Sequence, residues 1–177
     1  REAYVKTRAA RDAEILSRRP APLPSDTMDK AFLAAQLAEK LKHTWQQAVR
    51  AAEDARTDAK SGAARAVNLA TATRNRLEAA EAAWAAAADF KPAPLLKGER
   101  IKLGALVEVE DGEGGKTLFL APAGAGEELT GPGGDGFFQV VTPVSPLGRG
   151  LLGKKVGDVV EVMVKGELTE WDITWTA

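Results

Sequence analysis

Two long helical stripes separated by a short break constrain the fold of this chain more than any other feature. The first stripe of apolar residues recurs at steps of three and four, at Leu33, Leu37, Leu41, Trp45, Ala48, Ala52 and Ala55. After Ser61 and Gly62 comes a second stripe, at Ala66, Ala70, Thr73, Leu77, Ala80, Trp84 and Ala87. Its alternation of four and three is the spacing of a coiled-coil seam. The simplest arrangement of two such helices is an antiparallel hairpin.

The composition of the seam changes along the hairpin. Leu37, Leu41 and Trp45 are expected to face Leu77 and Trp84 at its base, whereas the seam near the Ser-Gly break is almost pure alanine. Alanine lets two backbones approach closely but buries little surface, so the tip is predicted to be thin and weakly held. An ordinary helical bundle with many alanines is the alternative.

The ends of the hairpin follow from local signals. Asp26 is a suitable N-cap for the first helix. The run Asp-Phe-Lys-Pro-Ala-Pro at residues 89–94 ends the second helix, because two prolines cannot continue it and the residue before a proline disfavours helix. Residues 1–19 form at most one weak helix, and prolines at 20, 22 and 24 make the following stretch an extended spacer.

Beyond residue 94 the apolar period becomes that of strands. Short β-rich runs are predicted at residues 103–109, 117–120, 136–141, 159–164 and 168–175. Glycine-rich turns at residues 111–115 and 131–136 lie between them and match no nucleotide-binding spacing. The fold class is therefore α+β, with a helical hairpin followed by a small antiparallel β domain.

One helix is predicted inside this β domain. Ser145 is a good N-cap and Pro146 fits a first helical turn, so a short helix begins there. A turn over residues 153–158 closes it and leads into the strand at 159–164.

Residues 145–162 read SPLGRGLLGKKVGDVVEV. This run resembles the C-terminal signature of the Gre-type (GreA/GreB) transcription elongation factors, in which it lies in a small FKBP-like domain behind a long helical hairpin. The likeness extends over residues 28–177. It implies an extension and proline-rich spacer at 1–27, a coiled-coil hairpin at 28–90, a linker at 91–97 and an FKBP-like domain at 98–177.

The resemblance also implies a partner. Members of that family dock the globular domain on the rim of bacterial RNA polymerase and insert the hairpin into the secondary channel. Carried over onto this sequence, the docking residues are Ser145, Pro146, Leu147 and Arg149. Such a protein regulates the polymerase and is not itself an enzyme.

The hairpin tip departs from the family pattern. Cleavage-stimulating members carry acidic tip residues that help to hold a second magnesium ion. Here the stretch between Ala59 and Leu77 holds four cations, among them Lys60 and Arg65, and no carboxylate. Asp58 is the nearest acid, and flanking cations oppose a divalent ion.

We therefore predict a divergent Gre-type factor that modulates or inhibits elongation without strong transcript cleavage. Asp54 lies four residues before Asp58, on the same helical face. An active cleavage factor that uses these two carboxylates is the alternative.

Composition excludes several other classes. The chain has no cysteine, which removes disulfides and thiolate sites. It has no apolar run near the ~20 residues of a membrane span and no secretory core at its start, so we expect a cytoplasmic protein without a membrane partner. No cofactor or metal is predicted. Residues 28–97 carry eleven basic and eight acidic groups, and residues 98–177 carry seven and thirteen, so the two halves present different surfaces.

Three rival functions stay open at this point. The FKBP-like fold suggests a prolyl isomerase, whose pocket would need aromatics such as Phe119, Phe137, Phe138, Trp171 and Trp175. The arms could pair between chains in a coiled-coil scaffold, whereas a polymerase factor is expected to be a monomer. Direct binding of DNA or other nucleic acid is the third possibility, because residues 56–77 carry five basic groups. No aromatic residues are interleaved with them for base stacking, so any contact with transcription-complex nucleic acid is expected to be indirect. The lone His43 lacks partners for catalysis.

Overall fold

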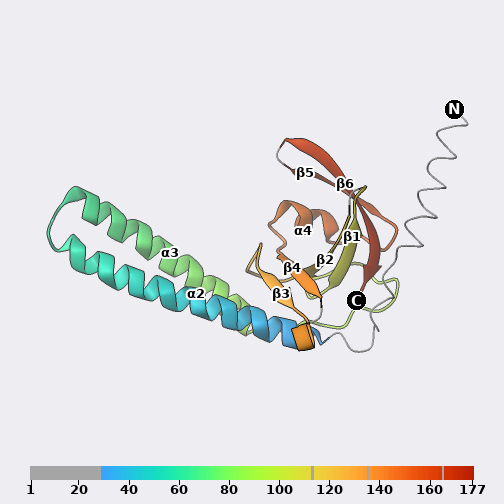
Figure 1. Cartoon of the computed structure of the whole chain (residues 1–177), viewed down its shortest axis with the longest axis horizontal. Helices are drawn as coiled ribbons and strands as arrows, with labels where there is room; N and C mark the ends of the chain where they lie inside the picture. The colour runs from blue at the N-terminus through green and yellow to red at the C-terminus, as the bar shows by residue number, and fades with distance from the viewer. Residues whose placement is uncertain (1–28, 113, 135, 165) are drawn as a thin grey trace, which may run out of the picture.

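The protein is a long helical hairpin joined to a six-stranded sheet domain (Figure 1). A computed structural model describes residues 29–112, 114–134, 136–164 and 166–177. Helix α2 (Lys30–Ala59) and helix α3 (Ala64–Ala88) form the arm. The N-cap of α2 is Asp29, whose side chain accepts a hydrogen bond from the Phe32 amide at 3.0 Å. The predicted cap, Asp26, lies outside the described residues.

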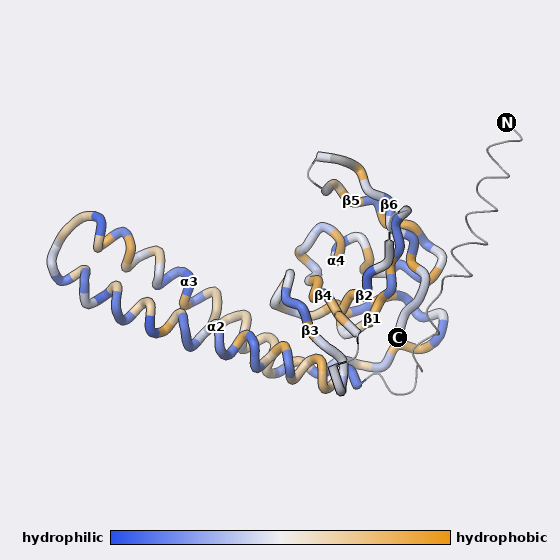
Figure 2. The backbone as a smooth tube through the Cα atoms, viewed as in Figure 1, coloured by the Kyte–Doolittle hydropathy of each residue, from blue (hydrophilic) through white to orange (hydrophobic). Residues whose placement is uncertain are grey.

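The predicted seam joins the two helices and confirms the antiparallel hairpin. Ala55 of α2 and both Thr73 and Ala87 of α3 are buried. Near the base, the rings of Trp45 and Trp84 stack with their centroids 4.6 Å apart and an interplanar angle of 17°. Figure 2 shows hydrophobic and hydrophilic residues alternating along both helices. The apolar seam is thus used within one chain.

The described residues of the sheet domain form six strands and one short α-helix. The strands are β1 (Leu106–Glu110), β2 (Gly115–Leu120), β3 (Glu128–Thr130), β4 (Phe137–Val141), β5 (Val159–Val164) and β6 (Glu167–Thr176). Helix α4 (Pro146–Leu151) lies between β4 and β5, and a 3-10 turn (Pro132–Gly134) precedes β4. The strand order is β3-β4-β2-β1-β6-β5.

The predicted α+β fold is confirmed, but the sheet is mixed and not antiparallel throughout, because β2 and β4 are parallel, with Thr117 opposite Phe138. After β2 the chain forms β3 at the edge of the sheet. It then turns back to form β4, which lies between β3 and β2 and is antiparallel to β3, so β4 runs in the same direction as β2. Sequence periodicity missed β3, which is only three residues long in a glycine- and proline-rich region. The other five predicted strands are present within a few residues of their expected bounds.

The sheet has an apolar core on each face. One face packs against α4, with a buried cluster that comprises Ile101, Ala105, Val107, Val109, Leu118, Leu120, Val141, Leu151, Val160, Val162, Trp171 and Ile173. The other face packs against the base of the hairpin, with a cluster that comprises Leu33, Ala34, Leu37, Leu41, Ala87, Leu106, Phe119, Ala121, Leu129, Phe138 and Val140. The arm and the sheet therefore share one core.

This shared core changes the role expected for the base leucines. Leu37 and Leu41 were expected to serve the pairing of the two helices, but they also cover the sheet, and Leu37 is 0% exposed. Polar contacts reinforce the packing: Gln36 bonds the Thr130 amide at 2.9 Å, and the Lys40 ammonium donates to the Glu128 carbonyl at 2.8 Å. Helix α2 thus holds the edge strand β3 in place.

Candidate functional site: the hairpin tip and the Ser145 turn

The tip of the arm is a tight turn between α2 and α3. Helix α2 ends at Ala59, and the amide and hydroxyl of Ser61 both donate to the Asp58 carbonyl, at 3.1 and 2.8 Å. Gly62 has φ of +72° and its amide bonds the Ala59 carbonyl at 3.0 Å. A residue without a side chain suits this left-handed position, which closes the helix. The N-cap of α3, Ala63, offers no side-chain acceptor.

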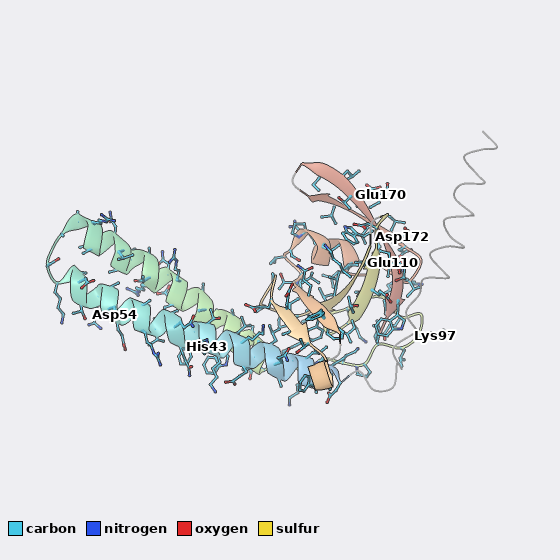
Figure 3. The ribbon with its side chains drawn as sticks, viewed as in Figure 1. His43, Asp54, Lys97, Glu110, Glu170 and Asp172 are labelled. Atoms are coloured by element: carbon cyan, nitrogen blue, oxygen red, sulfur yellow. The ribbon has the colours of Figure 1, made fainter. Side chains whose placement is uncertain are left out.

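The four tip residues singled out by the sequence are all exposed. Lys60 follows α2 directly, and Arg65 lies in the first turn of α3. Asp54 and Asp58 lie in the last turns of α2, and neither forms an ion pair or side-chain hydrogen bond among the described residues. Figure 3 shows Asp54 on the distal arm, far from the sheet domain, with His43 nearer the base. The two carboxylates thus have no charged or hydrogen-bonding partner within the described part of the chain.

The tip does not form a metal site by itself. Among the described residues, no three acidic, histidine or cysteine side chains are gathered closely enough to hold a metal ion. Asp54 and Asp58 supply at most two carboxylates, and Arg56 and Lys60 lie beside Asp58 in the sequence. A magnesium ion takes oxygen ligands and is disfavoured by neighbouring cations. These residues therefore do not fit the ion that the family resemblance implies.

A groove runs along the distal half of the arm, where the seam is rich in alanine. Its volume is about 860 Å³, and both helices line it, with Val49 and Ala52 on one side and Val67 and Ala70 on the other. Small side chains do not fill the space between the helices, so the distal arm is less densely packed than the base, as the sequence predicted.

The Ser145 turn is held by a compact hydrogen-bond network. The Ser145 hydroxyl accepts from the amides of Gly148 and Thr142, each at 3.2 Å, and donates to the Thr142 carbonyl at 2.8 Å. The predicted N-cap and the proline in the first turn of α4 are confirmed. Below this turn, the buried Thr142 hydroxyl has no hydrogen-bond partner among the residues that the structure describes.

Two glycines let α4 lie close to its neighbours. A β-carbon on Gly148 would come within 2.1 Å of the Thr142 carbonyl oxygen. A β-carbon on Gly150 would come within 2.4 Å of a Val160 methyl group. Both distances are too short for real atoms, so the motif requires glycine at both positions to bring α4 against the turn and β5.

The four predicted docking residues divide into two kinds. Ser145 is engaged by internal hydrogen bonds, and Leu147 packs against the α4 core. Pro146 and Arg149 are exposed, although Arg149 also donates to the Val144 carbonyl at 3.1 Å. Val144 is 81% exposed and lies beside them. The exposure of Val144 was not predicted, because the sequence shows only that an apolar residue directly precedes the N-cap.

A small polar cluster forms the joint between the arm and the sheet. Lys30 donates to the Ala93 carbonyl at 3.3 Å, and Lys102 donates to Glu99 at 2.6 Å. The bond from Lys102, together with one from the Leu96 amide, holds the pKa of the Glu99 carboxyl below its usual range. Burial, with repulsion from Lys102, lowers the pKa of Lys30.

The aromatic residues of the sheet domain do not form an isomerase-type pocket. Phe119, Phe138 and Trp171 are buried in the two cores, and Phe137 is 74% exposed. Phe119 also contacts Phe90 across the joint, with ring centroids 6.2 Å apart. These side chains hold the fold together. No helix in the described part of the chain is long and apolar enough to cross a membrane.

The chain is thus an α+β protein in which a long two-helix arm is attached to a mixed sheet with one short, capped helix. Residues 96–175 match the sequence profile described as "Transcription elongation factor, GreA/GreB, C-term". Residues 96–175 therefore form a C-terminal domain of the GreA/GreB transcription elongation factor type.

A curated relative supports this assignment. The chain is 34% identical over 73 residues to the transcription elongation factor GreA of Alkaliphilus oremlandii. The match covers 41% of this chain and 42% of that protein, so it spans less than half of the relative's length. None of the comparisons supports direct DNA binding.

Solved structures of related factors align with lower identity. GreA factor homolog 1 of Thermus thermophilus is 20% identical, with 81% of this chain and 92% of that chain covered and a TM-score of 0.33. The GreA/GreB elongation factor of Nitrosomonas europaea is 17% identical, with 68% and 94% covered and a TM-score of 0.34. Superpositions with TM-scores this low do not bear on function.

Proposed function

We propose that this protein binds bacterial RNA polymerase, with the Ser145 turn on the rim of the secondary channel and the helical arm inside it. We further propose that it modulates or inhibits elongation and does not strongly stimulate transcript cleavage. The match of the C-terminal domain supports the first part, because the resemblance implies this mode of docking. The second part depends on the chemistry of the tip.

The tip supports a non-cleaving role because its charges are those of a cationic probe. Between Ala59 and Leu77 the side chains include Lys60, Arg65, Arg74 and Arg76 and no carboxylate. Two-metal hydrolysis needs carboxylates to fix the ion that activates water. Cations suit contact with acidic groups or phosphates instead. The absence of a third metal-binding side chain near Asp54 and Asp58, among the described residues, is the observation that carries this proposal.

The arm has the dimensions and the anchoring that insertion into a channel requires. Helix α2 has 30 residues, so it extends about 45 Å at 1.5 Å per residue. Its base is fixed by the core shared with the sheet, which leaves the distal half projecting freely (Figure 1). A sheet domain that docks outside a channel would thereby fix the direction of the arm.

Binding to core RNA polymerase is the first test. In a pull-down the wild-type chain is expected to bind, and an active cleavage factor is expected to compete with it. Arg149→Glu should weaken binding about tenfold, because it reverses an exposed charge on the docking surface. Lys97→Glu is the matched control, since it makes the same change at an exposed position away from the Ser145 turn. Absence of binding by the wild type would overturn the proposal.

Transcript cleavage is the second test. A backtracked elongation complex incubated with this protein should release short 3′ RNA fragments no faster than without it. Asp54 and Asp58 are exposed and unpaired among the described residues, which is the one observation that favours an active cleavage factor. Rapid release that disappears in both Asp54→Ala and Asp58→Ala would establish that alternative and contradict the non-cleaving role.

A further inference from the structure

The two edge strands of the sheet, β3 and β5, differ in length and in how their backbones are covered. At one edge, β3 has three residues, and α2 covers its backbone: Gln36 bonds the Thr130 amide and Lys40 bonds the Glu128 carbonyl. At the other edge, β5 has six residues and pairs only with β6 among the described residues. Figure 1 shows β5 and the adjoining part of β6 projecting from the body of the domain.

The sequence of β5 gives this edge strand a single protecting charge, Glu161. Natural edges carry lysine, proline, a bulge or a cover, because unpaired backbone groups recruit other strands. The strand reads Val-Val-Glu-Val-Met-Val, which is apolar apart from Glu161. Val159 is 42% exposed and Met163 is 61% exposed. This edge is therefore open for pairing with an added strand.

Hydrogen-bond alternation shows which residues face outward. The Ile173 amide donates to the Asp158 carbonyl, and the Ile173 carbonyl accepts from Gly157. Because bonded and non-bonded pairs alternate in an antiparallel ladder, Val160 and Val162 bond to β6. The amides and carbonyls of Val159, Glu161 and Met163 consequently point away from the sheet.

Carboxylates gather beside this open edge. Glu161 lies directly opposite Glu170 on β6, and Asp172 lies directly opposite Glu110 on β1. Figure 3 shows Glu170, Asp172 and Glu110 on the same side of the molecule. Like charges directly opposite one another destabilise a sheet. A cation placed next to Glu161 would relieve this repulsion.

We propose that the outer edge of β5 binds an extended basic segment of a partner protein by strand addition. The segment places a lysine or arginine opposite Glu161 and apolar residues opposite Val159 and Met163. Main-chain hydrogen bonds to the edge provide affinity, and the alternating side chains provide specificity. This contact goes beyond the docking of the Ser145 turn and does not depend on it.

A second copy of this chain fits the edge less well than a basic segment. An antiparallel pairing of two β5 strands centred on Glu161 would set two of these carboxylates opposite each other, next to Glu170 of each copy. A shift by two residues would leave each Glu161 opposite an apolar side chain. Charge complementarity therefore favours a basic occupant.

The test uses the full chain and a synthetic probe, the acetylated and amidated peptide Thr-Val-Thr-Arg-Thr-Val-Thr. In a titration followed by NMR, the peptide should shift the amide signals of Val159, Glu161 and Met163 and slow their hydrogen exchange. Glu161→Lys should weaken the affinity about fivefold, because an exposed attraction becomes a repulsion. Glu81→Lys, the same change on α3, should leave it unchanged.

Two further variants separate backbone pairing from simple charge attraction. A peptide with an N-methylated arginine loses the amide that pairs with Glu161 and should not bind. Glu161→Pro removes the outward amide from the protein and should have the same effect, with wild-type thermal unfolding as the check on folding. The proposal would be overturned if the methylated peptide bound equally well or if the peptide left the β5 amide signals unshifted. Sedimentation that showed self-association through β5 would overturn it as well. None of these outcomes bears on polymerase binding.

Discussion

The two ends of the helical arm are made from the same two helices, yet they differ in packing and in chemistry. At the base, Leu33 and Leu37 are nearly inaccessible, and Trp45 stacks on Trp84, which packs against the core shared with the sheet. At the tip, alanines line a groove and the charged side chains are all exposed. The base thus supplies stability, and the tip presents charge without a rigid site.

This difference shows how one secondary structure can carry two functions. The base is constrained by its contacts with the sheet, so its side chains are large and apolar. The tip has few internal contacts to preserve, and its residues can vary in charge at little structural cost. In this chain the result is a cationic tip on an anchored arm.

The largest expected effect separates Leu37, buried against the sheet, from Leu77, which lines the groove in the middle of the arm. Leu37→Ala should lower the free energy of unfolding by about 3 kcal/mol, because it empties a fully buried position between α2 and the sheet. Leu77→Ala, in the groove-lined part of the arm, should cost about 1 kcal/mol. Chemical denaturation measures both. Equal costs would contradict the difference in packing.

The next effect compares glycines at the two sites. Gly148→Ala should cost about 2 kcal/mol, since its β-carbon would overlap the Thr142 carbonyl oxygen. Gly62→Asn should cost only a few tenths, because the tip is open and asparagine tolerates left-handed backbone. Thermal unfolding of both variants tests this. A larger loss for Gly62→Asn would show that the tip is more constrained than its packing indicates.

A smaller effect of opposite sign is expected under the Ser145 turn. Thr142→Val removes a buried hydroxyl that has no hydrogen-bond partner in the described part of the chain, and it keeps the shape of the side chain. It should raise the free energy of unfolding by up to about 1 kcal/mol. The exposed Thr71 of α3 provides the matched control, since Thr71→Val should not raise stability by this mechanism. A loss of stability in Thr142→Val would indicate that the hydroxyl is satisfied.

The smallest effect concerns pH at the joint between arm and sheet. The pKa of Glu99 is lowered in the folded chain, so its carboxylate stabilises the fold above the unfolded pKa, about 4.3. This contribution is lost as the pH falls through the lowered folded value. Glu99→Gln should therefore flatten the pH dependence of stability in acid, whereas Glu81→Gln should not. An NMR titration of Glu99 with a normal pKa would contradict this.

Local signals in the sequence predicted much of this structure. The apolar stripes that contain Trp45 and Trp84 predicted the hairpin, and Ser145 with Pro146 predicted the start of α4. Both predictions succeeded because helix seams and caps depend on residues that are close together in the sequence. The contact of Leu37 with the sheet was not predictable in this way, since a buried leucine carries no mark of which partner covers it.

The site was predictable only in part, for similar reasons. The sequence shows the charged tip residues Asp58, Lys60 and Arg65. The structure adds that their side chains are exposed and, among the described residues, belong to no metal-binding cluster. The parallel pairing of β2 and β4 was missed because a three-residue strand leaves no period. The outward position of Val144 depends on how the turn packs, which spacing alone does not reveal.

Because α2 and the sheet share one core, the base of the arm and the covered face of the sheet must change together in evolution. Phe119, Leu129 and Phe138 are covered by the arm, so a gene fragment that encodes the sheet alone would expose them to solvent. Recombination that exchanges arms between related factors therefore has to exchange matched sheet faces as well. A new tip can evolve by substitutions near Gly62, but a new base requires coordinated change on both sides.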